Sequence, residues 1–495
     1  MKGTSIIAVG AASLLLGSCT VGPDFLRPKA PAETRYTPGA DEQKPAGDQH
    51  FALGQKITGN WWTLYHSPPM NEVLEASIAG NRTLAAAEAT LAAAQQAVVE
   101  AEGPLFPQVD LNAAALRQHI NGTPFGLPKL PPTFPAYSNN FRVGGTVSYM
   151  VDAFGLTRRT VEQAAAQADA SDFELDAAYL SLTGNAVTQA ITIASLRAQI
   201  VTVDGIIADD QTNLRLVQTE VNAGTATQLD IEQAQAQLET DRTLRPPLSQ
   251  ALAAADHALA VLTGRIPADW SPPDFDLDKM TLPTDLPVTL PSDLVRQRPD
   301  ILASEAQLHA ASAAIGIATA ELYPNFTLSA ALSQQSISMD SLFSLKNQVG
   351  SVTGGVTYPL FHGGALEAQK QRAEDLYQSS LATYEQTVLQ SFDQVADVLD
   401  ALGHDAELLS AQQRALAASQ SSLDLNRRSY SLGNIGILQV LDAQRQLEQA
   451  RLGYVRARAQ RYLDTAQLFV ALGGAWWDWR EKDTGSTEPV SAPAR

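Results

Sequence analysis

The sequence predicts an α+β membrane protein built from two similar halves, each a pair of β-strands followed by a long helical hairpin. Three observations predict it: an internal duplication, segments that alternate between apolar and polar residues, and two helical stretches too long for a compact domain. Four strands cannot close a barrel alone, because the smallest common barrel has about eight. Three copies would supply twelve strands, and the helices would continue this β-barrel as an α-helical barrel.

The N-terminus has the pattern of a cleaved secretory signal. Lys2 gives a positive start, Ile6–Leu16 is apolar but too short to span a bilayer, and small residues precede Cys19. The pattern resembles a bacterial lipobox, which implies removal of residues 1–18 and acylation of Cys19. Thr20 favours sorting to the outer membrane over retention in the inner membrane. The alternative is an ordinary signal peptide with a chance cysteine.

Composition excludes several classes of function. The net charge of −19 argues against nucleic acid as a partner. The single cysteine allows no intramolecular disulfide and no thiolate-rich metal site. The sequence holds no HExxH zinc motif, no GxSxG nucleophile motif and no phosphate-binding GxxxxGK[ST] loop, so we expect no metal, no cofactor and no enzymatic activity. The histidines are scattered: His50, His66, His119, His257, His309, His362 and His404.

The duplication is visible as two matches whose offsets differ by eight residues, and the first match has no gap. Residues 81–107 align with residues 298–324, and both segments are Ala-rich and stop at a Leu-aromatic-Pro triplet. Further matches place Val143–Tyr149 over Val352–Tyr358, followed by matching glycines and a matching second helix. The order of helix, strand, turn and helix is therefore the same in both halves. We assign a first repeat to residues 61–283 and a second to residues 284–478, after an extended N-terminal segment, 19–60, and before a loose tail, 479–495.

Each repeat is expected to hold two strands of about ten residues, the length needed to cross a bilayer at a tilt. They fall within 108–152 and 325–361, where apolar residues alternate with polar ones. In the second repeat the returning strand is expected to include Tyr358 and Leu360. The loops His119–Asn139 and Ser333–Asn347 separate the strands. A soluble β-sandwich would explain the alternation equally well.

The helical hairpins are predicted at 157–263 and 363–473. The first arm of each lacks proline and would be about 100 Å long, more than a compact domain can bury. Short Gly-containing turns, Asn222–Thr227 and Gly433–Gly436, lead into a returning amphipathic helix. A soluble coiled-coil spacer is the alternative. The short join between strands and helices favours a barrel continued by a helical tube.

At this point the sequence resembles TolC-type outer-membrane efflux channels, in particular the lipoprotein branch of OprM-like and NodT-like proteins. The resemblance covers nearly the whole mature chain, and its motifs stand in the order of that family. They are Cys19–Asp24, Trp61–Tyr65, Arg298–Ile301, Tyr430–Gly433 with Val440–Ala443, and Ala471–Trp476.

This resemblance implies a homotrimer in the outer membrane, extending into the periplasm and anchored by lipid. It implies passive conduction of drugs or other small molecules to the exterior, and multidrug resistance as a consequence. The implied partners are a periplasmic adaptor (membrane fusion) protein and an inner-membrane pump of the RND type, which supplies the energy.

The resemblance also implies site residues. Asp442 would face the pore and form a ring of three carboxylates, a gate that favours cations. Gln439 stands where some relatives carry a second acid, and Gln233 holds the place of Asp442 in the first repeat, so the gate is expected in the second repeat alone. The hairpin tips would contact the adaptor through Gly224, Thr225, Ala226, Gly433, Asn434 and Ile435.

Two other functions remain open from the sequence. A lipid-anchored periplasmic scaffold or tether without a pore would explain the helices and the lipid, but it leaves the alternating strands without a role. A lipid-anchored hydrolase lacks any visible active-site pattern. Arg298–Pro299–Asp300 is interpreted as the start of a helix, with proline in its first turn and an acid near its N-terminus.

Overall fold

The computed structural model describes residues 20–33, 35–37, 47–55, 57, 59–119, 137–474 and 476. The predicted lipidation site Cys19, most of the loop 119–139 and the tail 479–495 lie outside the described residues. The chain divides into two compact units. One comprises 1–28, 91–171 and 304–384, and the other 29–90, 172–303 and 385–495. Each unit contains segments of both repeats. The boundary between the repeats near residue 283 is therefore not a boundary between the two units.

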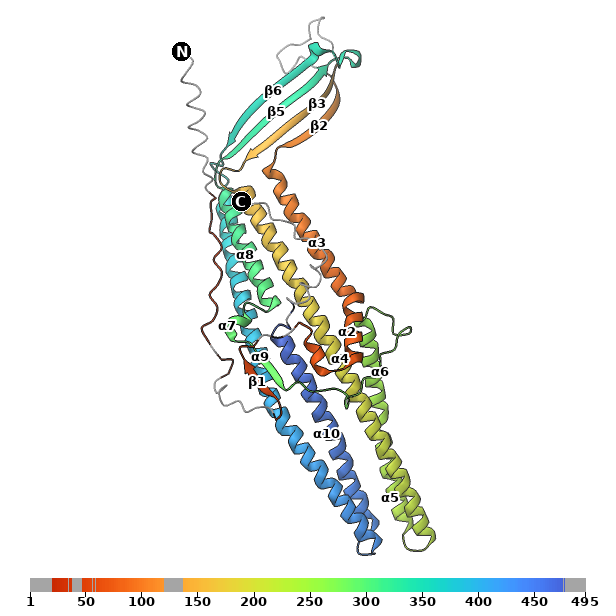
Figure 1. Ribbon diagram of the computed structural model, residues 1–495. Coiled ribbons are helices and arrows are strands. Elements are labelled where there is room, and N and C mark those ends of the chain that lie inside the picture. Colours follow the sequence, from red (N-terminus) through yellow and green to blue (C-terminus); the bar gives the residue numbers. More distant parts are fainter. Residues whose placement is uncertain are drawn as a thin grey trace. The chain divides into compact units, whose positions relative to one another are not determined.

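The first unit holds a four-stranded antiparallel sheet in the order β2-β3-β5-β6 (Figure 1). The strands are β2 (Gln108–His119), β3 (Tyr137–Val151), β5 (Asn325–Ser336) and β6 (Gln348–Thr357). The central pair β3–β5 joins the two repeats, with Val147 opposite Ala330. Strands β2 and β6 are therefore the edges of this sheet.

Apolar side chains of the sheet are exposed in the single chain. Examples are Leu111 at 83% and Val352 at 85%, one on each edge strand. Unpaired edges together with exposed apolar side chains are unstable in water, and they are stabilised by further strands and by lipid.

The second-repeat strands differ from the prediction at the C-terminal end of each strand. Strand β5 continues to Ser336, and two 3₁₀ turns, Met339–Ser341 and Leu345–Asn347, lie in the predicted loop. Strand β6 stops at Thr357, so Tyr358 and Leu360 are not part of it. Pro359 explains the early end, because proline has no N–H to donate to a ladder.

The strands connect to long helices, and the two repeats match in length. Helices α4 (Leu156–Asn222) and α9 (Ala365–Ser431) each have 67 residues. The Ala-rich helices α3 (Arg82–Glu102) and α8 (Pro299–Ala320) precede β2 and β5. Within the first unit, Ile315 and Ala318 of α8 pack against Ala373 and Tyr377 of α9.

The second unit contains the greater part of the two hairpins, residues 172–262 and 385–471, and the turns at their ends can be followed in Figure 1. Helix α9 returns as one helix, α10 (Ile437–Ala471), as predicted. Helix α4 returns as two, α5 (Gln228–Arg242) and α6 (Arg245–Leu262), where a single helix was predicted. The prolines at positions 246 and 247 explain the break, because a proline inside a helix removes a hydrogen bond and clashes with the preceding turn.

The second unit also has a small core that the sequence did not predict. Strand β1 (His50–Leu53) pairs in parallel with β4 (Asp285–Val288). Nearby are a 3₁₀ helix (Trp61–Tyr65), α2 (Pro68–Gly80) and α7 (Pro291–Leu294). Trp61 is fully buried and stacks on Phe469 of α10, with ring centroids 5.1 Å apart. This core holds the N-terminal segment of the chain against the C-terminal helix.

One window of α4 is apolar enough to cross a membrane by length and composition, with a mean hydropathy of 1.4. In the structure 44% of that window is buried. The fully buried Val187 and Ile191 of α4 belong to the core of the second unit. Helix packing therefore accounts for apolar residues in this helix.

Candidate gate and docking tips of the helical hairpins

Both hairpin tips have the same backbone geometry. Gly224 and Gly433 adopt φ of +76° and +74°, a region that side chains rarely allow. The amides of Gly224 and Thr225 donate to the carbonyls of Val221 and Glu220, at 3.0 and 2.9 Å. The second tip repeats this pattern, with Gly433 donating to Tyr430 and Asn434 to Ser429. These bonds form a Schellman motif, which ends each long helix cleanly and exposes the turn.

A hydrophobic cluster lies behind the tips and combines both hairpins. Val217 of α4 and Ala234 of α5 join Leu423 of α9 and several residues of α10, of which Leu447 is 1% exposed. Ile435, a predicted docking residue, is partly buried and packs against this cluster. The hydroxyl of Tyr430 also donates to Glu220, linking the two tips. Of the predicted tip residues, Gly224, Thr225, Gly433 and Asn434 are exposed.

Asp442 lies in the second turn of α10, and its side chain is 50% exposed. It accepts hydrogen bonds from Arg445, which also forms an ion pair with it, and from Gln446 at 2.9 Å. The sequence analysis missed Arg445, although the spacing of three residues on a helix places the two side chains on one face. The carboxylate is thus exposed but partly neutralised by its own helix.

The first repeat differs at the corresponding place. Gln233 of α5 is half-buried, and its side-chain carbonyl oxygen is buried without a hydrogen-bond donor among the described residues. Gln439, one turn before Asp442, is exposed and neutral. The two repeats therefore present different chemistry at equivalent places, an exposed acid in one and a half-buried amide in the other.

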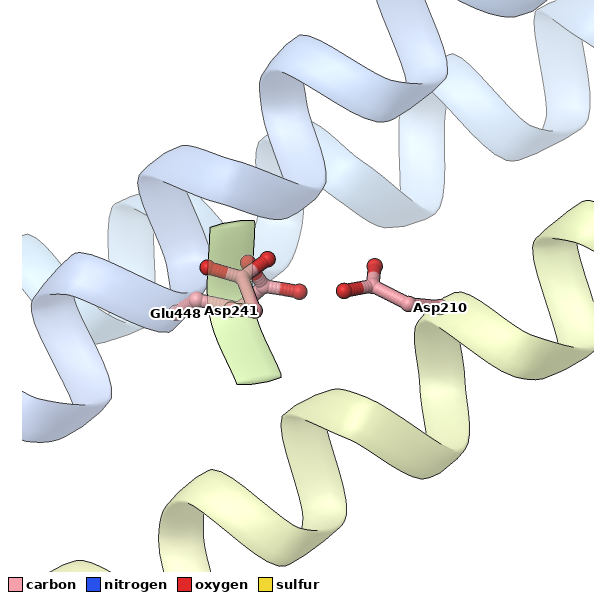
Figure 2. Close-up of side chains that lie close together, drawn as sticks. All are labelled: Asp210, Asp241 and Glu448. Carbon is pink, nitrogen blue, oxygen red and sulfur yellow. The ribbon is translucent and has the colours of Figure 1, made fainter. Parts of the chain in front are cut away.

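The structure buries acidic residues that the sequence analysis did not identify. Asp210, Asp241 and Glu448 lie together between α4, α5 and α10 (Figure 2). Burial is the main cause that raises the pKa of Asp210 to about 8 and that of Glu448 to about 7. The local sequence gives little signal for them, because buried polar residues such as Asn213 and Gln444 share their helix faces with apolar ones.

A second buried pair, Asp405 of α9 and Asp464 of α10, gives a testable pH dependence. Burial, a hydrogen bond to Asp464 and its charge raise the pKa of Asp405 to about 7. Because the folded pKa lies above the unfolded value of about 3.9, the folded state binds the proton more tightly, and stability falls as pH rises from about 4 to 7.

We expect Asp405→Asn, which cannot ionise, to raise the free energy of unfolding by about 1–3 kcal/mol at pH 8 and by much less at pH 4. Urea unfolding followed by helical circular dichroism at both pH values measures the difference. Asp424→Asn, at an exposed position on the same helix, is the control. Equal effects of Asp405→Asn at the two pH values would contradict a raised pKa of Asp405 in the folded state.

Arg298, directly before α8, forms hydrogen bonds with residues far from it in the sequence. Its guanidinium pairs with Asp300 at 2.6 Å and donates to the carbonyl of Ala471 at 2.8 Å and to the side chain of Gln394 at 2.9 Å. The indole N–H of Trp476 donates to the carbonyl of Gln297 at 2.7 Å. The start of α8 is therefore bonded to the end of α10, so two of the recognised motifs meet in space.

The segment that follows the predicted lipidation site is fixed within the first unit. Arg159 of α4, with a side chain 4% exposed, donates to the carbonyl of Val21 at 3.2 Å and to the carboxylate of Asp24 at 2.9 Å. Gly22 crosses α8 at Gly316 so closely that a Cβ on Gly22 would lie 2.5 Å from the Cα of Gly316. Two glycines thus allow backbone-to-backbone contact at this crossing.

Comparisons with known proteins agree with this architecture. The model of the family "Outer membrane efflux protein" matches residues 73–265 and 290–474. The probable efflux pump outer membrane protein SepC of Pseudomonas putida is 29% identical over 486 residues, covering 97% of this chain and 98% of that protein. The pyoverdine export outer membrane protein OpmQ of Pseudomonas aeruginosa is also 29% identical, with the same coverage.

Solved structures give the same result. The outer-membrane channel OprN has a TM-score of 0.83 and 26% identity, and the match covers 92% of this chain and all of that one. The outer membrane protein VceC of Vibrio cholerae has a TM-score of 0.77 and 25% identity, over 85% of this chain and all of that one. Similarity over nearly full length in both comparisons extends to the sheet and to the hairpins.

Proposed function

The chain belongs to the outer membrane efflux protein family, and we propose that three copies form a duct whose periplasmic end is narrowed by Asp442. The chain is an outer-membrane channel subunit of an efflux system, and the family is of the channel type rather than enzymatic. No catalytic role is proposed for its residues. The energy comes from the inner-membrane pump, and the duct conducts passively.

The observation that supports a three-chain duct is the sheet with two free edges. Strands β2 and β6 expose apolar residues, and four strands are too few to close a barrel. Pairing β6 of one copy with β2 of the next would satisfy every edge and turn exposed apolar side chains toward lipid. A lipid-anchored scaffold without a pore would leave these edges unpaired.

The proposed gate rests on the position of Asp442 near the hairpin tip. Three exposed carboxylates around a narrow opening would attract cations and repel anions. Arg445 lowers the effective charge of each carboxylate, so the two residues together set the selectivity of the opening. Moving the three copies of the second tip apart would widen the ring of Asp442 carboxylates. A docked adaptor would drive this movement.

Conductance of the purified trimer in planar bilayers tests the gate. A carboxylate about 4 Å from a cation in water is worth about 1 kcal/mol, so we expect Asp442→Asn to lower the preference for potassium over chloride about fivefold. Arg445→Ala should shift the preference in the opposite direction, because it leaves Asp442 unneutralised. Asp424→Asn, an exposed acid elsewhere on the same hairpin, is the matched control.

Two outcomes would count against this function. Absence of conductance in every variant would favour the scaffold without a pore. Unchanged selectivity in both Asp442→Asn and Arg445→Ala would keep the channel but remove these residues from its gate.

We also propose that both tips bind the periplasmic adaptor. Each tip is a short exposed turn on a rigid helical arm, and this geometry suits insertion between the helices of a partner. We expect Thr225→Trp and Asn434→Trp each to lower co-purification of the adaptor at least about tenfold, a loss of about 1.4 kcal/mol. Val261→Trp, at a position 63% exposed on α6, is the control. Normal adaptor recovery with both tip variants would contradict the proposal.

Finally, we propose that Cys19 carries covalent lipid and anchors the chain in the outer membrane. The hydrogen bonds from Arg159 to Val21 and Asp24 would then hold the anchor at a fixed place on the first unit. Apart from this lipid, no cofactor is proposed. The cargo is a small molecule selected by the upstream pump.

A further inference from the structure

The acidic cluster of the second unit joins three helices that belong to different repeats. Asp210 of α4 and Asp241 of α5 come from the first repeat, and Glu448 of α10 comes from the second. They are 3%, 7% and 5% exposed, and one carboxylate oxygen from each lies within 4.8 Å of the others. Figure 2 shows Asp210 pointing across the gap toward the other two.

Neighbouring side chains donate hydrogen bonds to some of the carboxylate oxygens of this cluster but not to all of them. The side-chain amide of Gln444 donates to Asp210 at 3.2 Å and to Glu448 at 3.1 Å, and Gln237 donates to Asp241 at 2.7 Å. These donors are neutral amides. Arg451 of α10 pairs at 3.6 Å with the more exposed Asp209, and its charge partly offsets the rise in the pKa of Glu448. Within the described residues, no Lys, Arg or His nitrogen lies within 4.0 Å of the three carboxylates.

One oxygen of Asp210 has no donor among the described residues, although its carboxyl also shares with Asp241 a hydrogen bond that raises the pKa of Asp210. Oδ2 of Asp210 is buried, and no donor among the described residues forms a hydrogen bond with it. The whole residue is only 3% exposed, so solvent does not replace this donor. A buried carboxylate oxygen without a donor is costly, and two further acids beside it increase the cost. This oxygen and its two carboxylate neighbours would be stabilised together by a positive charge between them.

The donor atoms point to the kind of cation. Carboxylate oxygens suit hard divalent ions, and Ca²⁺ binds oxygen at about 2.3–2.6 Å. Two oxygens bound to one Ca²⁺ are therefore at most about 4.6–5.2 Å apart, and the three carboxylate oxygens, all within 4.8 Å of one another, meet this limit. Mg²⁺ usually keeps several of its waters, so a site of three buried carboxylates suits Ca²⁺ better.

We propose that Asp210, Asp241 and Glu448 bind one divalent cation of the size of Ca²⁺, which ties α10 of the second repeat to α4 and α5 of the first. This site is separate from Asp442 and needs no conduction for its detection. The ion would hold the two hairpins together behind their tips, where the hydrophobic cluster of Val217 and Leu447 also joins them.

Calcium binding to the purified full-length protein in detergent tests the proposal. The experiment uses the Asp442→Asn background, so that the proposed gate contributes no cation binding. After removal of metal with EDTA, isothermal titration with CaCl₂ should give one site per chain. Asp241→Asn, which keeps the shape of the side chain, should weaken binding at least about tenfold, and Glu448→Gln should do the same. Asp405→Asn, another buried carboxyl of the same unit, is the matched control and should bind normally.

Thermal stability supplies a second readout that separates a metal ion from a proton. In EDTA, Asp241→Asn should melt above its parent, because it removes one of three repelling carboxylates. In excess CaCl₂ the difference should shrink or reverse, because the parent binds the ion more tightly and gains more stability from it. No binding heat in the parent, or equal calcium-induced shifts in parent and Asp241→Asn, would overturn the proposal and leave a proton shared between Asp210 and Asp241.

Discussion

Replacing Trp61 by alanine is expected to lower the free energy of unfolding by about 3–5 kcal/mol, the usual effect of removing a large aromatic side chain from a core. Trp61 is fully buried, stacks on Phe469 and meets Trp62 edge to face at 6.0 Å. It lies where the N-terminal segment packs on α10, so the cavity left by alanine would be lined by elements from both ends of the chain.

Urea unfolding of the detergent-solubilised protein, followed by helical circular dichroism, measures this effect. Val201→Ala, at a position 71% exposed on α4, is the control and should change the free energy by less than about 0.5 kcal/mol. Trp61→Phe should retain most of the stability, because a ring still stacks on Phe469. An effect of Trp61→Ala no larger than that of Val201→Ala would show that this core does not stabilise the unit.

Gly22→Ala is expected to loosen the packing of residues 20–28 on α8 within the first unit. Gly22 has φ of +91°, and a Cβ there would meet the backbone of Gly316 at 2.5 Å, where neither partner can move aside. We expect the rate of limited proteolysis within residues 20–33 to rise at least about tenfold, which corresponds to a local loss of about 1.4 kcal/mol. The sheet and the hairpins should keep their circular dichroism signal.

Cys19→Ser provides the complementary control. It should abolish incorporation of labelled palmitate while leaving the segment as resistant to protease as the parent. Gly22→Ala should do the reverse and keep the label. Resistance to protease in Gly22→Ala would mean that the crossing at Gly316 does not hold the segment, and palmitate on Cys19→Ser would remove the proposed anchor.

The periodic parts of the fold could be predicted from the sequence. The alternation around Val147 and the long proline-free stretches gave the strands and both 67-residue helices, and the glycines at 224 and 433 gave the turns. The family resemblance carried by the quoted motifs is confirmed by the family match, and the fold and the outer-membrane efflux assignment are confirmed with it.

The remaining features depend on contacts between residues far apart in the chain. Strand β1 is only four residues long and pairs with β4 more than two hundred residues later, which no local pattern reveals. The cluster of Asp210, Asp241 and Glu448 was missed for the same reason, because its members come from three helices. By contrast, two features could have been predicted from local sequence. They are the pairing of Arg445 with Asp442, three residues apart on one helix, and the helix break before Pro246.

The matching turns at the two tips have a consequence for stoichiometry. In a trimer, the same backbone shape occurs at Gly224 and at Gly433, so six turns alternate around the ring. Their side chains differ, with Thr225 and Ala226 on one set and Asn434 and Ile435 on the other. A partner that recognises backbone shape therefore meets pseudo-sixfold symmetry and six sites. A partner that recognises side chains meets threefold symmetry and three.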